Sequence, residues 1–359
     1  MTDPSQNTVV VPGPAGFVAL MPSLFGYYPD GGFILCGINP STNEPRGMAS
    51  TELPTDPSHW EALVRDSLEF LMGSTAAHGI RTQAVVAFIC PDPSEPGYGA
   101  ESRVTHQPIT TYLREACAER QVHVLDSLYV TRTHWWSACC TKPECCPPEG
   151  KPIQDAAAEA FAAELGNHTP YVRRADVLAD LAPASGADAI RYSDAIDRAT
   201  IALHRKIRAE GNQTVVDDGK DLLADTIRSL AADTTPADLD DDRAAELLLL
   251  LQYRDVRDAG MQYIEPEEVG AARHLWRSLA RFGVEPYGDY RGTPLALYGL
   301  TAWAEGETGV ARIAAHAADA AEFGNSLAEL LVGLINTEPD FEVTRRMLHA
   351  HRAGLHSAD

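Results

Sequence analysis

The chain has 359 residues, enough for about two domains of ordinary size. Hydrophobic residues make up 45% of it and charged residues 22%, which excludes an intrinsically disordered chain. Acidic residues outnumber basic ones by 51 to 29, and the net charge of −22 repels nucleic-acid phosphates and anionic lipid surfaces. We therefore expect neither nucleic acid nor a membrane among the partners.

Three features predict a cytoplasmic protein. The first basic residue is Arg46, so no positively charged segment precedes an early apolar stretch, as it would in a secretory signal. The longest aliphatic run, Leu247 to Leu251, is far shorter than the roughly 18 residues of a membrane span. Seven cysteines in a chain of this length do not form a disulfide framework.

The first part of the chain alternates between predicted strands and helices. Short apolar runs between turn residues predict strands over 33–38, 47–53, 84–90, 122–130 and 134–139. Apolar residues at helical spacing predict helices over 17–25, 60–71 and 109–120, the first of them broken near Pro22.

This order predicts an α/β domain over residues 1–154, with a mainly parallel sheet and flanking helices. The strands at 33–38, 84–90 and 122–130 should be neighbours in that sheet, because consecutive units place their strands side by side. Ligands of such sheets usually bind beyond the carboxyl ends of the strands. Candidate site loops are therefore 39–46, 91–106 and 139–152.

From residue 155 to 359 the apolar period changes to 3.6 and predicts an all-α domain. The expected helices cover 156–165, 175–181, 189–208, 221–230, 243–259, 266–282, 294–304, 308–321 and 325–336. Short helices joined by tight glycine turns suggest tetratricopeptide-like helix pairs, with a compact helical bundle as the equal alternative. Small residues allow helices to approach closely, so we expect self-association through one alanine-rich face, formed by Ala311, Ala314, Ala315 and Ala318.

Four cysteines lie within eight positions of one proline-rich loop: Cys139, Cys140, Cys145 and Cys146. One interpretation is structural, with packed thiols or a local disulfide from Cys140 to Cys145 or Cys146. A second is a zinc site, since zinc prefers tetrahedral sulfur and nitrogen ligands and His134 could add an imidazole. A third is a reactive thiol, with Lys142 close enough to favour the thiolate. We expect Cys140, Cys145 and Cys146 to be the principal members of the cluster.

Three further residues near this loop are candidates to face a ligand. Asp126 lies in an apolar strand, where an acidic side chain must be paired or face a cleft. Trp136 directly precedes the loop and Glu149 ends it. For Asp126 we prefer a structural hydrogen-bonding role to a catalytic one.

The loop sequence resembles a known family. Trp136-Ser137 followed by Cys140-x4-Cys145-Cys146-Pro147-Pro148-Glu149-Gly150 is similar to the signature of the actinobacterial domain-of-unknown-function family numbered 4192. The resemblance covers nearly the whole chain, through segments 20–29, 52–54, 124–130, 256–258 and 302–312. The departures are Gly31-Gly32 and the additional Cys139. The resemblance implies a lineage and no activity.

These observations favour a non-catalytic binding or assembly protein, with a protein partner or a second copy of the chain as its target. The sequence contains no P-loop, no G-x-G-x-x-G after a predicted strand, no H-E-x-x-H and no G-x-S-x-G. The first alternative is a zinc- or thiol-dependent enzyme with its site at Cys139–Gly150. The second is a small-ligand sensor in which the sheet binds and the helices respond.

Overall fold

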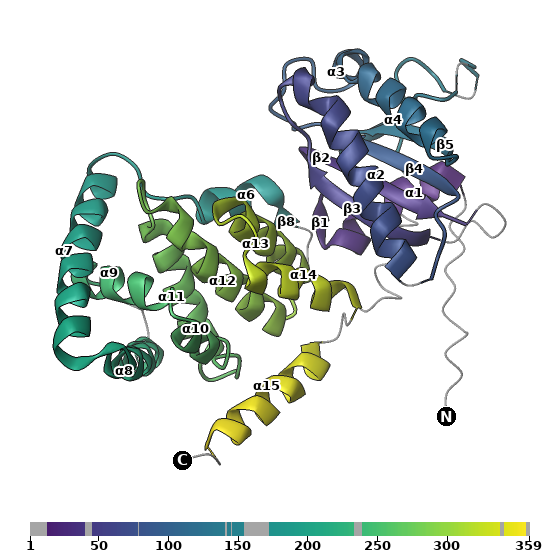
Figure 1. Cartoon of the computed structure of the whole chain (residues 1–359). Coiled ribbons are helices and arrows are strands. Elements are labelled where there is room, and N and C mark those ends of the chain that lie inside the picture. The colour runs from purple at the N-terminus through teal and green to yellow at the C-terminus, as the bar shows by residue number, and fades with distance from the viewer. Residues whose placement is uncertain are drawn as a thin grey trace. The chain divides into compact units, whose positions relative to one another are not determined.

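The chain forms two compact units. The computed structural model describes residues 13–39, 45–77, 79–140, 142–144, 146–153, 172–232, 239–337 and 341–356. Contacts divide the chain into residues 1–173, here called the sheet unit, and residues 174–359, the helical unit (Figure 1). The division predicted from the sequence falls after residue 154, and the segment 154–171 lies outside the described residues.

The sheet unit is built on a six-stranded sheet with the order β3-β2-β4-β5-β6-β7. Its strands are β2 (Gly32–Ile38), β3 (Pro45–Glu52), β4 (Ala84–Cys90), β5 (His123–Val130), β6 (His134–Ser137) and β7 (Lys151–Pro152). The predicted neighbours are confirmed, because β2, β4 and β5 lie side by side. A separate two-stranded sheet pairs β1 (Tyr27–Tyr28) with β8 (Val172–Arg173).

The expectation of a mainly parallel sheet is wrong. Of the five strand pairings in the six-stranded sheet, only β4 with β5 is parallel. The apolar runs of β2 and β4 look like parallel strands because both faces of each strand are buried. Burial on both faces requires helices on both sides of the sheet, and it does not depend on strand direction.

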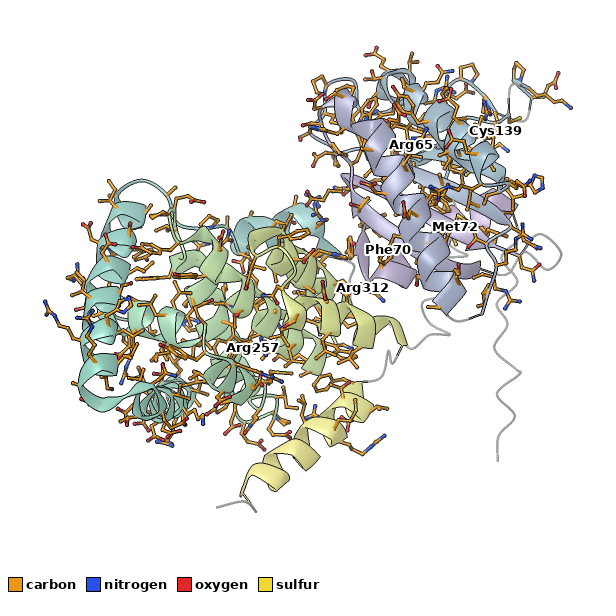
Figure 2. The ribbon with its side chains drawn as sticks, in the orientation of Figure 1. Arg65, Phe70, Met72, Cys139, Arg257 and Arg312 are labelled. Atoms are coloured by element: carbon orange, nitrogen blue, oxygen red, sulfur yellow. The ribbon has the colours of Figure 1, made fainter. Side chains whose placement is uncertain are left out.

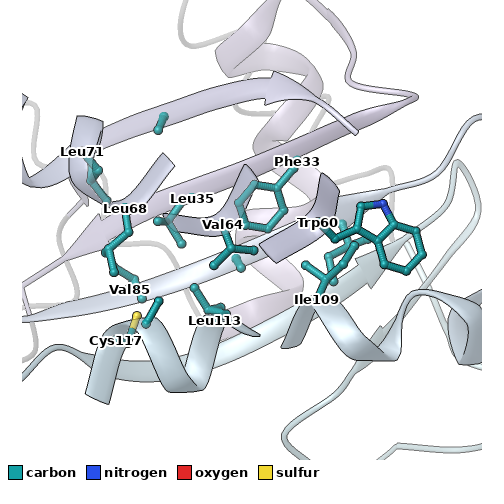
Figure 3. Close-up of a cluster of buried hydrophobic side chains, with 14 of the residues drawn as sticks. Phe33, Leu35, Trp60, Val64, Leu68, Leu71, Val85, Ile109, Leu113 and Cys117 are labelled. Atoms are coloured by element: carbon teal, nitrogen blue, oxygen red, sulfur yellow. The ribbon is translucent and has the colours of Figure 1, made fainter. Parts of the chain in front are cut away.

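Helices cover both faces of this sheet. The 3-10 turn η1 (Pro57–His59) and the helices α2 (Trp60–Ala77) and α4 (Gln107–Glu119) cover one face, and α1 (Gly13–Phe25) the other. Beneath α2 and α4, Phe33 and Leu35 of β2 pack with Val64 and Leu68 in one apolar cluster (Figure 3). On the opposite face, Phe17 of α1 packs against Phe88 at 6.3 Å between ring centroids.

Local chemistry explains the helix ends. Asp56 caps the turn that leads into α2, its carboxylate accepting the Ser58 N–H at 2.9 Å. Helix α1 is not broken at Pro22, as predicted, and continues to Phe25. It ends at Gly26, whose φ of 77° is favourable only for glycine, and whose N–H bonds the Pro22 carbonyl at 2.8 Å. A short helix, α3 (Ala100–Thr105), precedes α4.

The helical unit contains only helices among its described residues. They are α6 (Arg174–Asp180), α7 (Ala187–Glu210), α8 (Asn212–Ala232), α9 (Asp241–Leu250), α10 (Arg254–Gly260), α11 (Val269–Phe282), η2 (Gly288–Arg291), α12 (Gly292–Ala304), α13 (Thr308–Ala321), α14 (Ser326–Thr337) and α15 (Phe341–His356). The single helix predicted over 243–259 is two helices, and α15 was not predicted. The helix predicted over 156–165 lies outside the described residues. None of the described helices combines the length and apolar character needed to cross a bilayer.

The core of the helical unit surrounds α11 and α12. Trp276 of α11 is fully buried, and Gly260 brings α10 close to it, since a Cβ there would lie 3.3 Å from the indole. The alanine-rich face of α13 also faces this interior: Ala311 and Ala314 are fully buried, as are Ala315 and Ala318. The face predicted to mediate self-association therefore packs inside one chain, next to α12.

Candidate functional site

The cysteine loop leaves β6 through a turn that Ser137 holds. The Ser137 hydroxyl donates to Asp126 Oδ1 at 2.7 Å and accepts the backbone N–H groups of Cys139 and Cys140 at 3.2 and 3.0 Å. Asp126 Oδ1 also accepts the N–H of Ser127 at 2.8 Å. Asp126 therefore anchors the start of the loop, and its half-buried carboxylate is hydrogen-bonded within the protein.

Trp136 holds the far end of the same loop. Its indole N–H donates to the Pro148 carbonyl at 3.0 Å. Gly150 has a φ of 85°, and a Cβ at this position would lie 2.5 Å from the Trp136 ring. Only glycine fits a backbone that passes so close to a buried indole. Trp136 is thus a core residue that fastens the loop, whereas the neighbouring Glu149 is exposed.

The described thiols of the loop are partly accessible. Cys139, Cys140 and Cys146 are all half-buried, and the N–H of Cys146 bonds the Lys142 carbonyl at 2.8 Å in a single turn. Cys145 lies outside the described residues. Within the described part of the chain, no three His, Cys, Asp or Glu side chains are grouped so that they could hold a metal ion.

Arg114 of α4 supplies a positive charge to this loop. Its Nη2 lies 3.3 Å from Cys139 Sγ, and Figure 2 labels Cys139 beside α4. The sequence instead suggested Lys142 as the cation, and that side chain is exposed. No sequence signal identifies Arg114, because the contact depends on how α4 is rotated against the sheet, 25 residues away from Cys139 along the chain.

His134 lies at the opposite end of β6 from Ser137. The ring is half-buried, and Nδ1 lies 3.0 Å from the hydroxyl of Thr133. Its centroid is 6.1 Å from that of Trp136. Among the residues proposed from the sequence, the structure brings Asp126, Trp136, Cys139 and Cys140 into one anchored loop, with His134 at the strand end beside Trp136.

A second polar cluster lies at the carboxyl ends of β4 and β5. Arg132, just after β5, donates from Nε to Asp30 Oδ2 at 2.9 Å, and a second guanidinium N–H bonds the same oxygen. The Arg132 backbone N–H donates to the Tyr98 hydroxyl at 3.0 Å. Burial raises the pKa of Asp30, and the hydrogen bond from Arg132 opposes this increase. The sequence indicated the loop 91–106, but it did not indicate the pairing of Asp30 with Arg132.

Beneath this cluster, Ser102, His106 and Glu95 lie close together without forming a nucleophilic triad. His106 Nδ1 lies 2.8 Å from the Ser102 carbonyl, and a carbonyl only accepts, so Nδ1 carries the proton. The Ser102 hydroxyl is 3.3 Å from that same nitrogen, which therefore cannot act as its base. His106 also stacks on Trp60 at 5.1 Å, as expected for a packed histidine.

The comparisons with known proteins place the chain in one family. Residues 14–338, nearly the whole chain, match the family described as "Domain of unknown function (DUF4192)", and the chain belongs to it. The family suggested by the cysteine signature is thereby confirmed. Neither the curated proteins nor the solved structures gave a match.

Proposed function

We propose that this member of the DUF4192 family is a non-catalytic binding or assembly protein of the cytoplasm whose helical unit docks a protein partner. Two arrangements in the sheet unit support a binding role. Ser137 and Asp126 use their oxygens to hold backbone, and the His106 nitrogen nearest Ser102 is a donor. These side chains shape a scaffold and are not arranged as a nucleophile with its base.

The single observation that carries the proposal is the exposure of Phe323. This side chain, in the turn between α13 and α14, is 100% exposed, and Leu330 of α14 is 48% exposed. We call these two residues the Phe323 surface. An aromatic ring fully in water gains about 25 cal/mol for each Å² that a partner covers, and aromatic side chains often dominate binding energy at interfaces.

The surroundings indicate the chemistry of the partner. The exposed carboxylates Asp319 and Glu329 flank the Phe323 surface. A complementary partner would offer an apolar pocket rimmed by lysine or arginine. Tight turns at Gly306 and Gly324, with φ values of 82° and 75°, join α12 to α13 and α13 to α14. We propose that these are tetratricopeptide-like pairs, which present such surfaces.

Site-specific photocrosslinking tests this proposal. A photoreactive phenylalanine analogue replaces Phe323 in the full chain, expressed in the cells that naturally contain the protein. The matched control replaces Arg228, whose side chain is 73% exposed on α8. We expect one discrete cross-linked species at position 323 and none at position 228. The proposal fails if both positions give the same pattern.

Thiol chemistry at Cys139 is the second candidate, favoured by the Arg114 contact. A guanidinium 3.3 Å from sulfur stabilises a thiolate, which is the nucleophilic form. We expect Cys139 to be alkylated by iodoacetamide faster than Cys36, since burial raises the pKa of the Cys36 thiol to about 12. Arg114→Leu should slow the alkylation of Cys139 alone, as mapped by peptide mass spectrometry. An unchanged rate would exclude this role.

The zinc alternative remains a prediction from the sequence. Its ligands would be Cys140, Cys145 and Cys146, with His134, Cys139 or water completing the tetrahedron. Single serine substitutions of the first three cysteines should each lower the zinc content and the melting temperature of protein purified from zinc-containing medium. Full retention of both properties would remove zinc from consideration.

A further inference from the structure

The strand β3 is the last in the six-stranded sheet, and its outer edge pairs with no other described strand. The register shows which backbone groups point outward. The Leu53 N–H bonds the Gly31 carbonyl at 2.8 Å, so this pair is of the hydrogen-bonded type. The pairs then alternate, and Ala49 and Thr51 direct their N–H and C=O groups towards β2. The outward groups belong to Met48, Ser50 and Glu52.

The two halves of β3 differ in how open they are. The first half contains Pro45 and a register irregularity opposite Gly37, where Gly47 has a φ of 134°. Proline and bulges are devices that prevent a strand edge from pairing. The second half, Met48 to Glu52, is regular and contains neither. Met48 is 39% exposed there, and Thr51 and Glu52 are also exposed.

We propose that a second copy of this chain pairs antiparallel with the outer edge of β3, through residues Met48 to Glu52 around a two-fold axis at Ser50. In this register Ser50 faces Ser50 of the second copy, and Met48 faces Glu52. Each facing pair exchanges two backbone hydrogen bonds, because all three residues direct these groups outward. The six-stranded sheet becomes one continuous sheet across the two copies.

Side-chain positions favour this register. Ala49 and Leu53 face the core under α2, so Met48, Ser50 and Glu52 lie on the opposite face. Centring the axis on Ser50 keeps the pairing within the regular half of the strand. It also keeps the two Glu52 carboxylates at opposite ends of the contact, whereas an axis at Glu52 would oppose them directly.

Charge argues for a second copy as the occupant. Arg46 lies two residues beyond Met48, and Met48 faces Glu52 of the other copy. The exposed Arg46 is therefore a diagonal neighbour of that carboxylate, about 7–8 Å away along the ladder. The two-fold axis repeats this opposite-charge contact at both ends. The strand thus complements itself, which a chain with a net charge of −22 does at few places on its surface.

Sedimentation equilibrium of the full chain tests the pairing. We expect wild type to dimerise reversibly and Ser50→Lys, which opposes two ammonium groups at the axis, to weaken the dimer about tenfold or more. Ser50→Ala is the matched control, because it keeps the outward N–H and should remain dimeric. Phe323→Asp should also remain dimeric, so this result is independent of the Phe323 surface.

Hydrogen exchange at residue resolution gives a second readout. The amides of Met48, Ser50 and Glu52 should be protected only at concentrations where the dimer forms, while Ala49 and Thr51 are protected at all concentrations. A monomer at every concentration overturns the proposal. A dimer that Ser50→Lys does not weaken, or amides at 48, 50 and 52 that exchange equally at all concentrations, overturns it as well.

Discussion

The two units treat their buried tryptophans differently. In the sheet unit, the indole N–H of Trp60 donates to the Pro54 carbonyl at 2.7 Å, and that of Trp136 donates to the Pro148 carbonyl at 3.0 Å. In the helical unit, Trp276 and Trp303 are almost completely buried, and neither indole N–H has a hydrogen-bond partner within the described part of the chain.

The difference follows from what surrounds each ring. In the sheet unit, loops pass over the tryptophans, and a loop carbonyl is available as an acceptor. In the helical unit, neighbouring carbonyls are mostly committed to the i→i−4 bonds of their own helices. An unpaired buried donor costs about 1–3 kcal/mol, so the helical unit tolerates this cost in exchange for close packing. Tryptophans therefore tie loops to the core in one unit and only fill space in the other.

The largest expected effect is the loss of packing in the helical unit. Trp276→Ala should lower the free energy of unfolding by about 3–5 kcal/mol, since the side chain is fully buried against α10 and α12. Urea unfolding gives the magnitude, and hydrogen exchange in α10 to α12 shows where the structure loosens. Arg228→Ala, at an exposed position, should stay within about 0.5 kcal/mol of wild type. A loss below about 2 kcal/mol for Trp276→Ala would contradict packing as the main source of stability.

A smaller but still large effect is expected at the far end of the cysteine loop. Gly150→Ala should cost about 2–4 kcal/mol, because it combines a left-handed backbone with a Cβ 2.5 Å from the Trp136 ring. Protease nicking within residues 138–150 should rise along with the loss of stability. Gly79→Ala is the control, since it has a similar φ of 72° and no atom within 4 Å of its added Cβ. Equal losses for both variants would mean that Trp136 does not constrain the loop.

The tryptophan comparison itself predicts a difference of about 1 kcal/mol. Trp136→Phe leaves the Pro148 carbonyl without its donor, whereas Trp276→Phe removes a donor that has no described partner. Both variants lose the same volume. Trp136→Phe should therefore be the more destabilising of the two in matched urea titrations. If Trp276→Phe costs as much or more, its N–H has a partner and the contrast between the units is removed.

The smallest expected effect is electrostatic and depends on pH. The Arg277 guanidinium holds the pKa of Asp180 below its ordinary value of 3.8. The pair therefore stabilises the folded state above that value, and this contribution is lost as pH falls through the lowered pKa. Both side chains are more than a third exposed, which limits the effect to under about 1 kcal/mol. Arg277→Gln should destabilise at pH 7, and its difference from wild type should shrink on acidification. A gap that widens in acid would reverse the sign.

Most elements were predictable from the sequence, because the periodicity of a strand or helix is encoded within a few residues. The strands β2, β4 and β5 and the helices α11 to α14 lie close to where the apolar pattern places them. The split of 243–259 into α9 and α10 was missed, since Leu251 to Tyr253 interrupt the helix without a proline or glycine. The cysteine signature was sufficient to indicate the family.

The candidate site was only partly predictable. The sequence located the loop and its thiols, and Asp126 has the structural hydrogen-bonding role preferred for it. It did not indicate Ser137 as the residue that holds Cys139 and Cys140, or Gly150 as the residue that makes room for Trp136. A serine and a glycine are common in any loop, so their types alone carry no signal.

The sequence by itself determined where strands and helices lie, that the chain has a sheet followed by helices, and which family it belongs to. Only the tertiary structure decided strand direction, the burial of the alanine face of α13, the contact of Arg114 with Cys139 and the position of β3 at the sheet edge. The physical reason is range. Propensity and periodicity act between neighbours along the chain, whereas pairs such as Arg132 with Asp30, 102 residues apart, form only when whole elements pack together.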